Sequence, residues 1–315
     1  MALFPECACF QIFAQVVFAC IFLNFLWGCW NFIYVYFMGT YPDFHKYGKW
    51  SVVTGGTDGI GLAFVNKLAA LGQNIVVISR NPEKVEKVAL EVSEKYKVKT
   101  KQIAVDFGHG DIYPKIAKEL EDIDVGTLVN NVGVAQDIVK FLKIVDHGGN
   151  LENILTVNAE SLVKMTRLIL PGMIKKRKGI VVNMGSGSGI CPTPLLSVYS
   201  STKKFVDCFS KCMHSEYADK GIITLSFMPW FVATKMSEIS QPNFLVPCPE
   251  HVVSSALKTI GRCRRSYGCI SHFLQGKLCE DLPESFVSWI LRHILSRARE
   301  HVRGKPTVSQ ARSQQ

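Results

Sequence analysis

Apolar residues are concentrated at the start of the chain, where they form one long run. The residues from Ile12 to Met38 are all apolar apart from four: Gln15, Asn24, Gly28 and Asn31. The first basic residue of the chain is Lys46. A helix rises about 1.5 Å per residue, so this run is long enough to cross a hydrocarbon core about 30 Å thick. Residues 1–45 are therefore predicted to be a membrane anchor.

Other structures fit this segment less well. A cleaved signal peptide would carry a basic residue before a shorter apolar run, and a buried core helix would not need apolar residues on every face. Two short re-entrant helices remain an alternative to one span. Lys46 and Lys49 follow the run while only Glu6 precedes it, so the positive-inside rule predicts that the rest of the chain lies in the cytosol.

The residues after the anchor alternate between short strands that are apolar throughout and longer amphipathic helices. We expect strands at 50–54, 74–79, 102–106, 126–130, 179–184 and 222–228. We expect the main helices at 59–71, 82–95, 151–170 and 197–219. This alternation predicts a parallel sheet covered on both faces, a doubly wound α/β fold of the Rossmann type. Because the sequence shows no internal repeat or linker, residues 46–282 are interpreted as one domain.

The C-terminal segment, residues 283–315, has a different pattern. One helical stripe is apolar and consists of Phe286, Val287, Ile290, Leu291, Ile294 and Leu295. Six basic and two acidic residues give the segment a net charge of +4. Such a helix suits an anionic membrane surface, and docking on the domain or on a second copy of the chain is an equal alternative. No nucleic-acid motif accompanies the charge, so no nucleic-acid partner is expected.

Composition excludes further classes of protein. The 315 residues are 48% hydrophobic and 20% charged, which excludes a disordered chain, and the formal net charge is +10. The 11 cysteines lack the spacing of a disulfide framework. Cys208 and Cys212 share a helix face, but no second ligand pair follows them, so no metal site is expected.

A glycine cluster directly follows the first predicted strand and consists of Thr54-Gly55-Gly56-Thr57-Asp58-Gly59-Ile60-Gly61. This strand–turn–helix context is that of a dinucleotide site, because glycine lets the backbone approach a pyrophosphate and the helix N-terminus offers free N–H groups. The second predicted strand ends at Ser79 and Arg80, where an acidic residue would instead favour NAD. A guanidinium can pair with a 2′-phosphate, so Arg80 predicts NADP(H).

Tyr199 and Lys203 form the second candidate constellation. Residues four apart share a helix face, and a nearby cation lowers the pKa of a tyrosine from its usual value of about 10. Ser186 ends the fifth predicted strand, where its hydroxyl can bond the same substrate oxygen. The glycine–serine run at 185–189 does not fit the G-x-S-x-G turn of hydrolases. The spacing therefore favours proton transfer to a carbonyl over nucleophilic attack.

Taken together, these motifs resemble the short-chain dehydrogenase/reductase family. The glycine cluster, Asn130-Asn131-Val132-Gly133, Asn158, Ser186 and Tyr199-x3-Lys203 follow the family's order over about residues 48–235. The apolar start, Gly48-Lys49-Trp50 and the run from Phe231 to Met236 are most similar to one membrane-bound branch. That branch contains 17-beta-hydroxysteroid dehydrogenases and very-long-chain 3-oxoacyl-CoA reductases.

The resemblance implies roles for matching residues. Tyr199 would be the proton donor, Lys203 would lower its pKa and hold the nicotinamide ribose, and Ser186 would orient the carbonyl. Asn158 would hold a water in a proton relay. The implied cofactor contacts are Thr54, Gly55, Asp58, Gly59, Ile60, Gly61, Ser79, Arg80, Asp106, Asn131, Gly133, Tyr199, Lys203, Pro229, Val232 and Thr234.

Residues 229–249 are the expected substrate loop, and its apolar side chains suit a hydrophobic substrate. The expected substrate contacts are Ser186, Trp230, Phe231 and Met236. Trp230 stands where the wider family has glycine, so it is either a core aromatic or a wall of the substrate site.

The sequence thus predicts a membrane-anchored, NADPH-dependent ketone reductase of the endoplasmic reticulum membrane that faces the cytosol. A long-chain 3-oxoacyl-CoA is slightly favoured over a 17-oxosteroid as the substrate. Membrane lipid and a second copy of the chain are the expected partners. The alternative is a catalytically silent member that binds NADP(H) and serves as a membrane partner protein. The presence of Asn158, Ser186, Tyr199 and Lys203 together argues against it.

Overall fold

The computed structural model describes residues 8–144 and 150–303. A single parallel sheet of seven strands has the order β3-β2-β1-β4-β5-β6-β7. The strands are β1 (Trp50–Thr54), β2 (Asn74–Ser79), β3 (Thr100–Ala104), β4 (Val125–Asn130), β5 (Gly179–Met184), β6 (Ile222–Phe227) and β7 (Arg265–Ser266). The predicted doubly wound α/β fold is confirmed.

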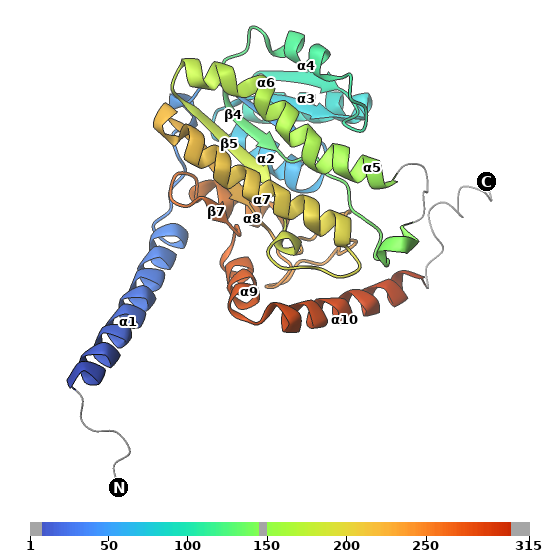
Figure 1. Ribbon diagram of the computed structural model, residues 1–315. Coiled ribbons are helices and arrows are strands. Elements are labelled where there is room, and N and C mark those ends of the chain that lie inside the picture. The colour runs from blue at the N-terminus through green and yellow to red at the C-terminus, as the bar shows by residue number, and fades with distance from the viewer. Residues whose placement is uncertain (1–7, 145–149, 304–315) are drawn as a thin grey trace.

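Helices cover both faces of the sheet because its strands are apolar on both sides. The helices are α1 (Ala8–Tyr36), α2 (Gly59–Ala70), α3 (Pro82–Tyr96), α4 (Tyr113–Leu120), α5 (Asn150–Leu155), α6 (Ser161–Lys175), α7 (Ser197–Tyr217), α8 (Pro249–Lys258), α9 (Ile270–Asp281) and α10 (Glu284–Arg303). Buried side chains of α2, α3 and α8 form one core cluster with the sheet. Those of α4, α6 and α7 form the other, and Figure 1 shows α6 and α7 crossing in front of the strands.

Two predicted elements differ from the structure. The strand expected at 102–106 lies at Thr100–Ala104, because β3 is an edge strand whose half-exposed residues hide the apolar pattern. The helix expected at 151–170 is interrupted by a π-helical turn at Thr156–Glu160 and continues as far as Lys175. The short elements α4, β7, α8 and α9 were not predicted.

The apolar N-terminal run forms one continuous helix rather than two re-entrant ones. Within α1, residues Phe10–Tyr36 are long and apolar enough to span a membrane, which suggests membrane anchoring. Most of α1 projects away from the domain (Figure 1), but its last turns pack against it. Val35 is buried there, and the Arg262 guanidinium donates to the Tyr34 carbonyl at 3.3 Å.

The C-terminal helix α10 docks on the domain through one of its faces. Val287 and Leu295 are buried in this contact. The Ser288 hydroxyl donates to the carbonyl of Pro192, in the loop after β5, at 3.0 Å. The apolar face of this basic amphipathic helix is therefore partly used for packing against the domain.

Candidate active site

The glycine turn between β1 and α2 lies at the carboxyl end of the sheet. Gly55 has a φ of +66° and Gly59 a φ of +52°, a region that favours glycine. A Cβ on Gly61 would overlap the Gly55 carbonyl oxygen, so the first turn of α2 approaches the end of β1 closely because residue 61 lacks a side chain. The turn places the N-terminus of α2 at the carboxyl ends of the neighbouring strands β1 and β4, where the strand order reverses. Such folds bind nucleotides at this point.

Asn131 holds this turn in position from the end of β4. Its side-chain amide donates to the carbonyls of Thr54 and Gly55 at 2.9 and 3.1 Å. In return, the Thr54 hydroxyl accepts hydrogen bonds from the backbone N–H groups of Asn131 and Val132. The Asn131 side chain therefore holds the glycine turn that forms the groove wall. The sequence analysis expected only that Asn131 would contact the cofactor.

The structure brings Tyr199, Lys203 and Ser186 together. Tyr199 and Lys203 lie one turn apart near the start of α7, with the Lys203 ammonium 5.5 Å from the centre of the Tyr199 ring. Ser186 follows β5, and its hydroxyl faces the Tyr199 phenol. The Ser186 oxygen also accepts a hydrogen bond from the Ser188 hydroxyl at 3.0 Å. Two hydroxyls and one ammonium thus converge at the end of β5.

Electrostatics at Tyr199 differ from the sequence expectation. Burial raises the pKa of Tyr199, and the facing Ser186 hydroxyl opposes that rise only in part. The Lys203 ammonium does not bond the phenol but donates to the Met184 carbonyl at 3.0 Å. Burial lowers the pKa of Lys203 to about 8. The protein alone therefore keeps the phenol protonated near neutral pH.

Asn158 lies in the π-helical turn between α5 and α6 and is buried. Its amide forms a pair of hydrogen bonds with the backbone of Val134, at 2.8 and 3.0 Å. A Cβ on Gly133 would lie 3.2 Å from the Asn158 oxygen and 3.5 Å from the Lys203 nitrogen. Asn158 thus fixes the chain after β4 beside Lys203, and π-helical turns often mark functional sites.

The positions expected to contact the adenosine half of the cofactor lie at the ends of β2 and β3. The Ser79 hydroxyl bonds the Thr57 hydroxyl of the glycine turn at 3.0 Å, which joins β2 to that turn. Arg80 is exposed directly after β2. Asp106 is exposed two residues after β3, and its carboxylate accepts the Gly108 N–H at 2.9 Å. Arg80 can therefore turn toward a bound phosphate.

The loop after β6 carries the remaining expected residues. The Pro229 carbonyl accepts the Gly187 N–H at 2.7 Å, and the ring of Trp230 packs directly over Gly187. Val232 is buried, whereas Phe231 and Met236 are exposed. The Thr234 side chain lies next to Gly59, where it would contact an added Cβ. The ammonium of its neighbour Lys235 bonds the Asp58 carboxylate at 2.9 Å. The loop therefore closes over the glycine turn.

A buried donor in this loop is without a partner among the described residues. The indole N–H of Trp230 is enclosed and makes no hydrogen bond to residues in the described ranges. Lys203 uses one of its three ammonium protons in the described part of the chain, on Met184. With the N-terminus of α2 and the exposed Arg80, these donors fit a nicotinamide dinucleotide and a substrate oxygen.

Gln136 is a positioning residue that the sequence analysis missed. Its amide oxygen accepts the backbone N–H groups of Val198 and Tyr199, both at 3.0 Å, so it caps the start of α7. Its amide nitrogen donates to the Leu195 carbonyl at 3.2 Å. Gln136 is buried and lies 63 residues before Tyr199, so no local spacing points to it.

His272 of α9 is a second missed residue. Its Nδ1 accepts the backbone N–H of Trp230 at 3.3 Å and its Nε2 lies 3.1 Å from the Phe231 carbonyl, so the neutral Nε2–H tautomer satisfies both contacts. Burial lowers the pKa of His272 to about 4, although the hydrogen bond to Phe231 opposes this. His272 therefore fixes the substrate loop while uncharged.

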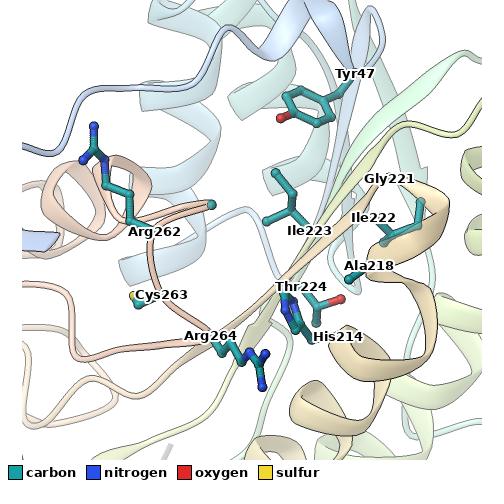
Figure 2. A pocket seen from close by; sticks show the side chains of 11 residues that line it. Tyr47, His214, Ala218, Gly221, Ile222, Ile223, Thr224, Arg262, Cys263 and Arg264 are labelled. Carbon is teal, nitrogen blue, oxygen red and sulfur yellow. The ribbon is translucent and has the colours of Figure 1, made fainter. Parts of the chain in front are cut away.

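A cavity of about 440 Å³ lies at the opposite end of the sheet (Figure 2). Tyr47, the start of β6 and the loop from Gly261 to Arg264 line it. Because the residues of the candidate site lie at the carboxyl ends of the strands, this cavity does not belong to that site.

Comparison with known proteins agrees with this geometry. The family model described as short chain dehydrogenase matches residues 49–243. A very-long-chain 3-oxoacyl-CoA reductase of Bos taurus is 48% identical over 244 residues, 77% of each chain. A protein of the same name from Homo sapiens is 44% identical over 257 residues, 81% of each chain.

Solved structures share the fold at lower sequence identity. A 7beta-hydroxysteroid dehydrogenase has a TM-score of 0.72 at 22% identity, over 78% of this chain and 98% of its own. A short-chain dehydrogenase from Sphingobium yanoikuyae in complex with NADPH has a TM-score of 0.64 at 23% identity, over 75% and 96%. Both similarities concern the arrangement of the sheet and its helices.

Proposed function

This chain belongs to the short-chain dehydrogenase family, and we propose that it reduces the 3-oxo group of a very-long-chain 3-oxoacyl-CoA with NADPH. The observation that carries the substrate class is the similarity to reductases of that name, at 44–48% identity over about four fifths of both chains. The exposed apolar residues of the substrate loop suit a long acyl chain.

Tyr199 of α7 and Ser186, which follows β5, perform the proton transfer. Tyr199 carries a protonated phenol in a buried site and gives its proton to the carbonyl oxygen that is being reduced. The Ser186 hydroxyl donates a hydrogen bond to the same oxygen and fixes the substrate. When bound, NADPH supplies the hydride that reduces the carbonyl carbon.

Lys203 supplies positive charge beside the phenol. Its ammonium has two protons beyond the bond to Met184, and the nitrogen lies close to Gly133. This ammonium would hold the ribose hydroxyls of a bound cofactor, and its charge would stabilise the phenolate left by proton transfer. Asn158 supports this arrangement through Val134, and its water-holding role remains a prediction.

NADPH is proposed over NADH because of the chain's own residues after β2. Arg80 is exposed there, so its guanidinium is free to pair with a 2′-phosphate. The helix N-terminus of α2 and the glycine turn would hold the pyrophosphate. Asp106 lies after the neighbouring strand β3, where it would contact the adenine.

We place the protein in the endoplasmic reticulum membrane with its catalytic domain in the cytosol. The long apolar helix Phe10–Tyr36 supports anchoring, and Lys46 and Lys49 on its domain side support this orientation. The partners of the protein are then its acyl-CoA substrate and the membrane lipid around its anchor. A homodimer remains a further proposal.

The test is NADPH oxidation by membranes that contain the full chain, with a long 3-oxoacyl-CoA and a 17-oxosteroid offered separately. We expect turnover with the acyl-CoA that exceeds turnover with the steroid. Preference for the steroid would overturn the substrate assignment. NADPH binding without turnover of either ketone would instead identify a catalytically silent member.

A further inference from the structure

The end of the anchor is fixed to one particular helix of the domain. Phe273 of α9 packs against Phe32 and Tyr36 of α1, with ring centroids 4.8 and 5.0 Å apart. Figure 1 shows that α1 leaves the domain on the side that carries α9 and α10. Whatever surrounds α1 therefore also lies close to α9.

Helices α9 and α10 both carry exposed apolar side chains. Leu274 and Leu278, four residues apart on α9, are 52% and 61% exposed. Phe286 and Trp289 of α10 are 47% and 57% exposed, and their rings stack with centroids 6.1 Å apart. Single exposed apolar residues are ordinary, but four on two consecutive helices, one of which packs against the anchor, indicate a contact surface. We call these four residues the α9–α10 apolar surface.

The exposed aromatics of α10 are not part of its docking face. Val287 and Leu295 are buried against the domain, whereas Phe286 and Trp289 lie on the other side of the helix. Trp289 also stacks on the exposed His293 ring, with centroids 4.4 Å apart. Docking on the domain thus accounts for one apolar face of α10 and leaves the second available.

The charges around this surface suit a phospholipid interface. Arg292 and Arg297 of α10 are exposed. The acidic residues at the end of α9 are paired with cations, because Lys277 bonds Asp281 at 3.0 Å and Arg265, which also binds Asp207, pairs with Glu280. The aromatic pair is preceded by the exposed Glu284 and followed by Arg292 and Arg297. Aromatic residues with basic residues on the same helix are typical of a helix that lies in a membrane interface.

We propose that the α9–α10 apolar surface inserts into the lipid interface beside α1, with a phospholipid bilayer as its occupant. This proposal rests on the proposed anchoring by α1. Gln275 of α9 bonds the Leu245 carbonyl of the substrate loop at 3.1 Å, so α9 holds that loop next to the same surface. The substrate loop therefore opens toward the bilayer, where a long acyl chain dissolves.

The experiment uses the full chain reconstituted into vesicles of phosphatidylcholine with some phosphatidylserine, in the presence or absence of acyl-brominated phospholipid. The emission of Trp289 is obtained as the difference between the natural chain and the Trp289→Phe variant. We expect brominated lipid to quench roughly half or more of this difference, as for a side chain in the interface. Acrylamide in the water should quench it weakly.

Leu90→Trp on α3 is the matched control, because Leu90 is 53% exposed on an element far from α1 in Figure 1. Its added emission should respond to acrylamide and not to brominated lipid. If the Trp289 difference behaves like this control, the surface faces water and the proposal is wrong. Protection from both quenchers would mean that protein, such as a second copy, covers it, which also overturns the proposal. Flotation with the vesicles tests the α1 anchor separately.

Discussion

The buried ammonium of Lys203 donates a hydrogen bond to the backbone carbonyl of Met184 at 3.0 Å. This contact ties α7 to the end of β5 and holds the cation beside Tyr199, whose ring centre is 5.5 Å away. Burial lowers the pKa of Lys203 to about 8, because desolvation disfavours its charged form. The charge of the site therefore changes near physiological pH.

A pH dependence of reduction follows from this pKa. Lys203 is cationic below about pH 8 and becomes neutral above it, whereas the raised pKa of Tyr199 keeps the phenol protonated across that range. We expect kcat/KM for reduction by NADPH to fall as the pH rises through about 8. The measurement is a pH–rate profile on reconstituted membranes. A profile that stays flat well into the alkaline range would remove the charge of Lys203 from the mechanism.

Removal of the phenol should separate chemistry from cofactor binding. In Tyr199→Phe the proton donor is lost while Lys203 and the glycine turn stay in place. We expect turnover to fall by about 10²- to 10⁴-fold with NADPH affinity largely kept. Single-turnover kinetics and cofactor titration by fluorescence measure the two quantities. Full activity in this variant would show that another group donates the proton.

The Gln136 cap predicts a matched pair of variants. Gln136→Leu removes the acceptor for the N–H groups of Val198 and Tyr199, whereas Gln136→Glu keeps an acceptor at a helix N-terminus that favours negative charge. We expect the leucine variant to lose about 1 kcal/mol of stability and several-fold in kcat. The glutamate variant should recover most of the kcat. Equal loss of kcat in both variants would mean that the cap does not position Tyr199.

The sequence predicts what local spacing determines and misses what distant residues contribute. Tyr199 and Lys203 were found because a four-residue interval on a helix is visible in the sequence. The glycine turn was found because its residues are consecutive. Gln136 and His272 were missed, since each is a single polar residue with distant partners. Gln136 bonds residues 62 and 63 positions later in the chain, and His272 bonds residues 41 and 42 positions earlier. The prediction that Lys203 lowers the pKa of Tyr199 was also wrong for the protein alone. Helical spacing shows that the two residues share a face, but it does not show that the ammonium bonds the Met184 carbonyl instead of the phenol.

Cofactor choice is tested at Arg80, which is exposed after β2. In Arg80→Ala the partner for a 2′-phosphate is lost, and charge-assisted bonds of this kind contribute about 1.5–3 kcal/mol each. We expect KM for NADPH to rise by about 10-fold or more with little change for NADH. Steady-state kinetics with both cofactors measure this difference. An equal effect on NADPH and NADH would contradict the assignment of the 2′-phosphate to this residue.

The ion pair between Asp207 and Arg265 predicts that the folded state loses stability in acid. Asp207 of α7 is buried, and its carboxylate bonds Arg265 of β7 at 3.0 Å and the Ser226 hydroxyl at 2.8 Å. Burial alone would raise the pKa of Asp207, but these bonds outweigh it and lower the pKa to about 2 from a usual 3.8. The folded state thus binds this proton less readily than the unfolded state. The stabilisation is complete above about pH 4 and is lost as the pH falls from 3.8 toward 2.

Asp207→Asn should show this contribution directly. The variant leaves the Arg265 guanidinium without its buried carboxylate, and a broken buried pair costs about 3–5 kcal/mol. We expect a lower free energy of unfolding near pH 7, and a gap from the natural chain that narrows as the pH falls below 3.8. Denaturant unfolding in detergent micelles across this pH range measures both. Lys211→Met, which removes only the half-exposed partner of Asp207, should cost about 1 kcal/mol or less. An equal loss in the two variants would mean that the buried bond to Arg265 is not the main source of this stability.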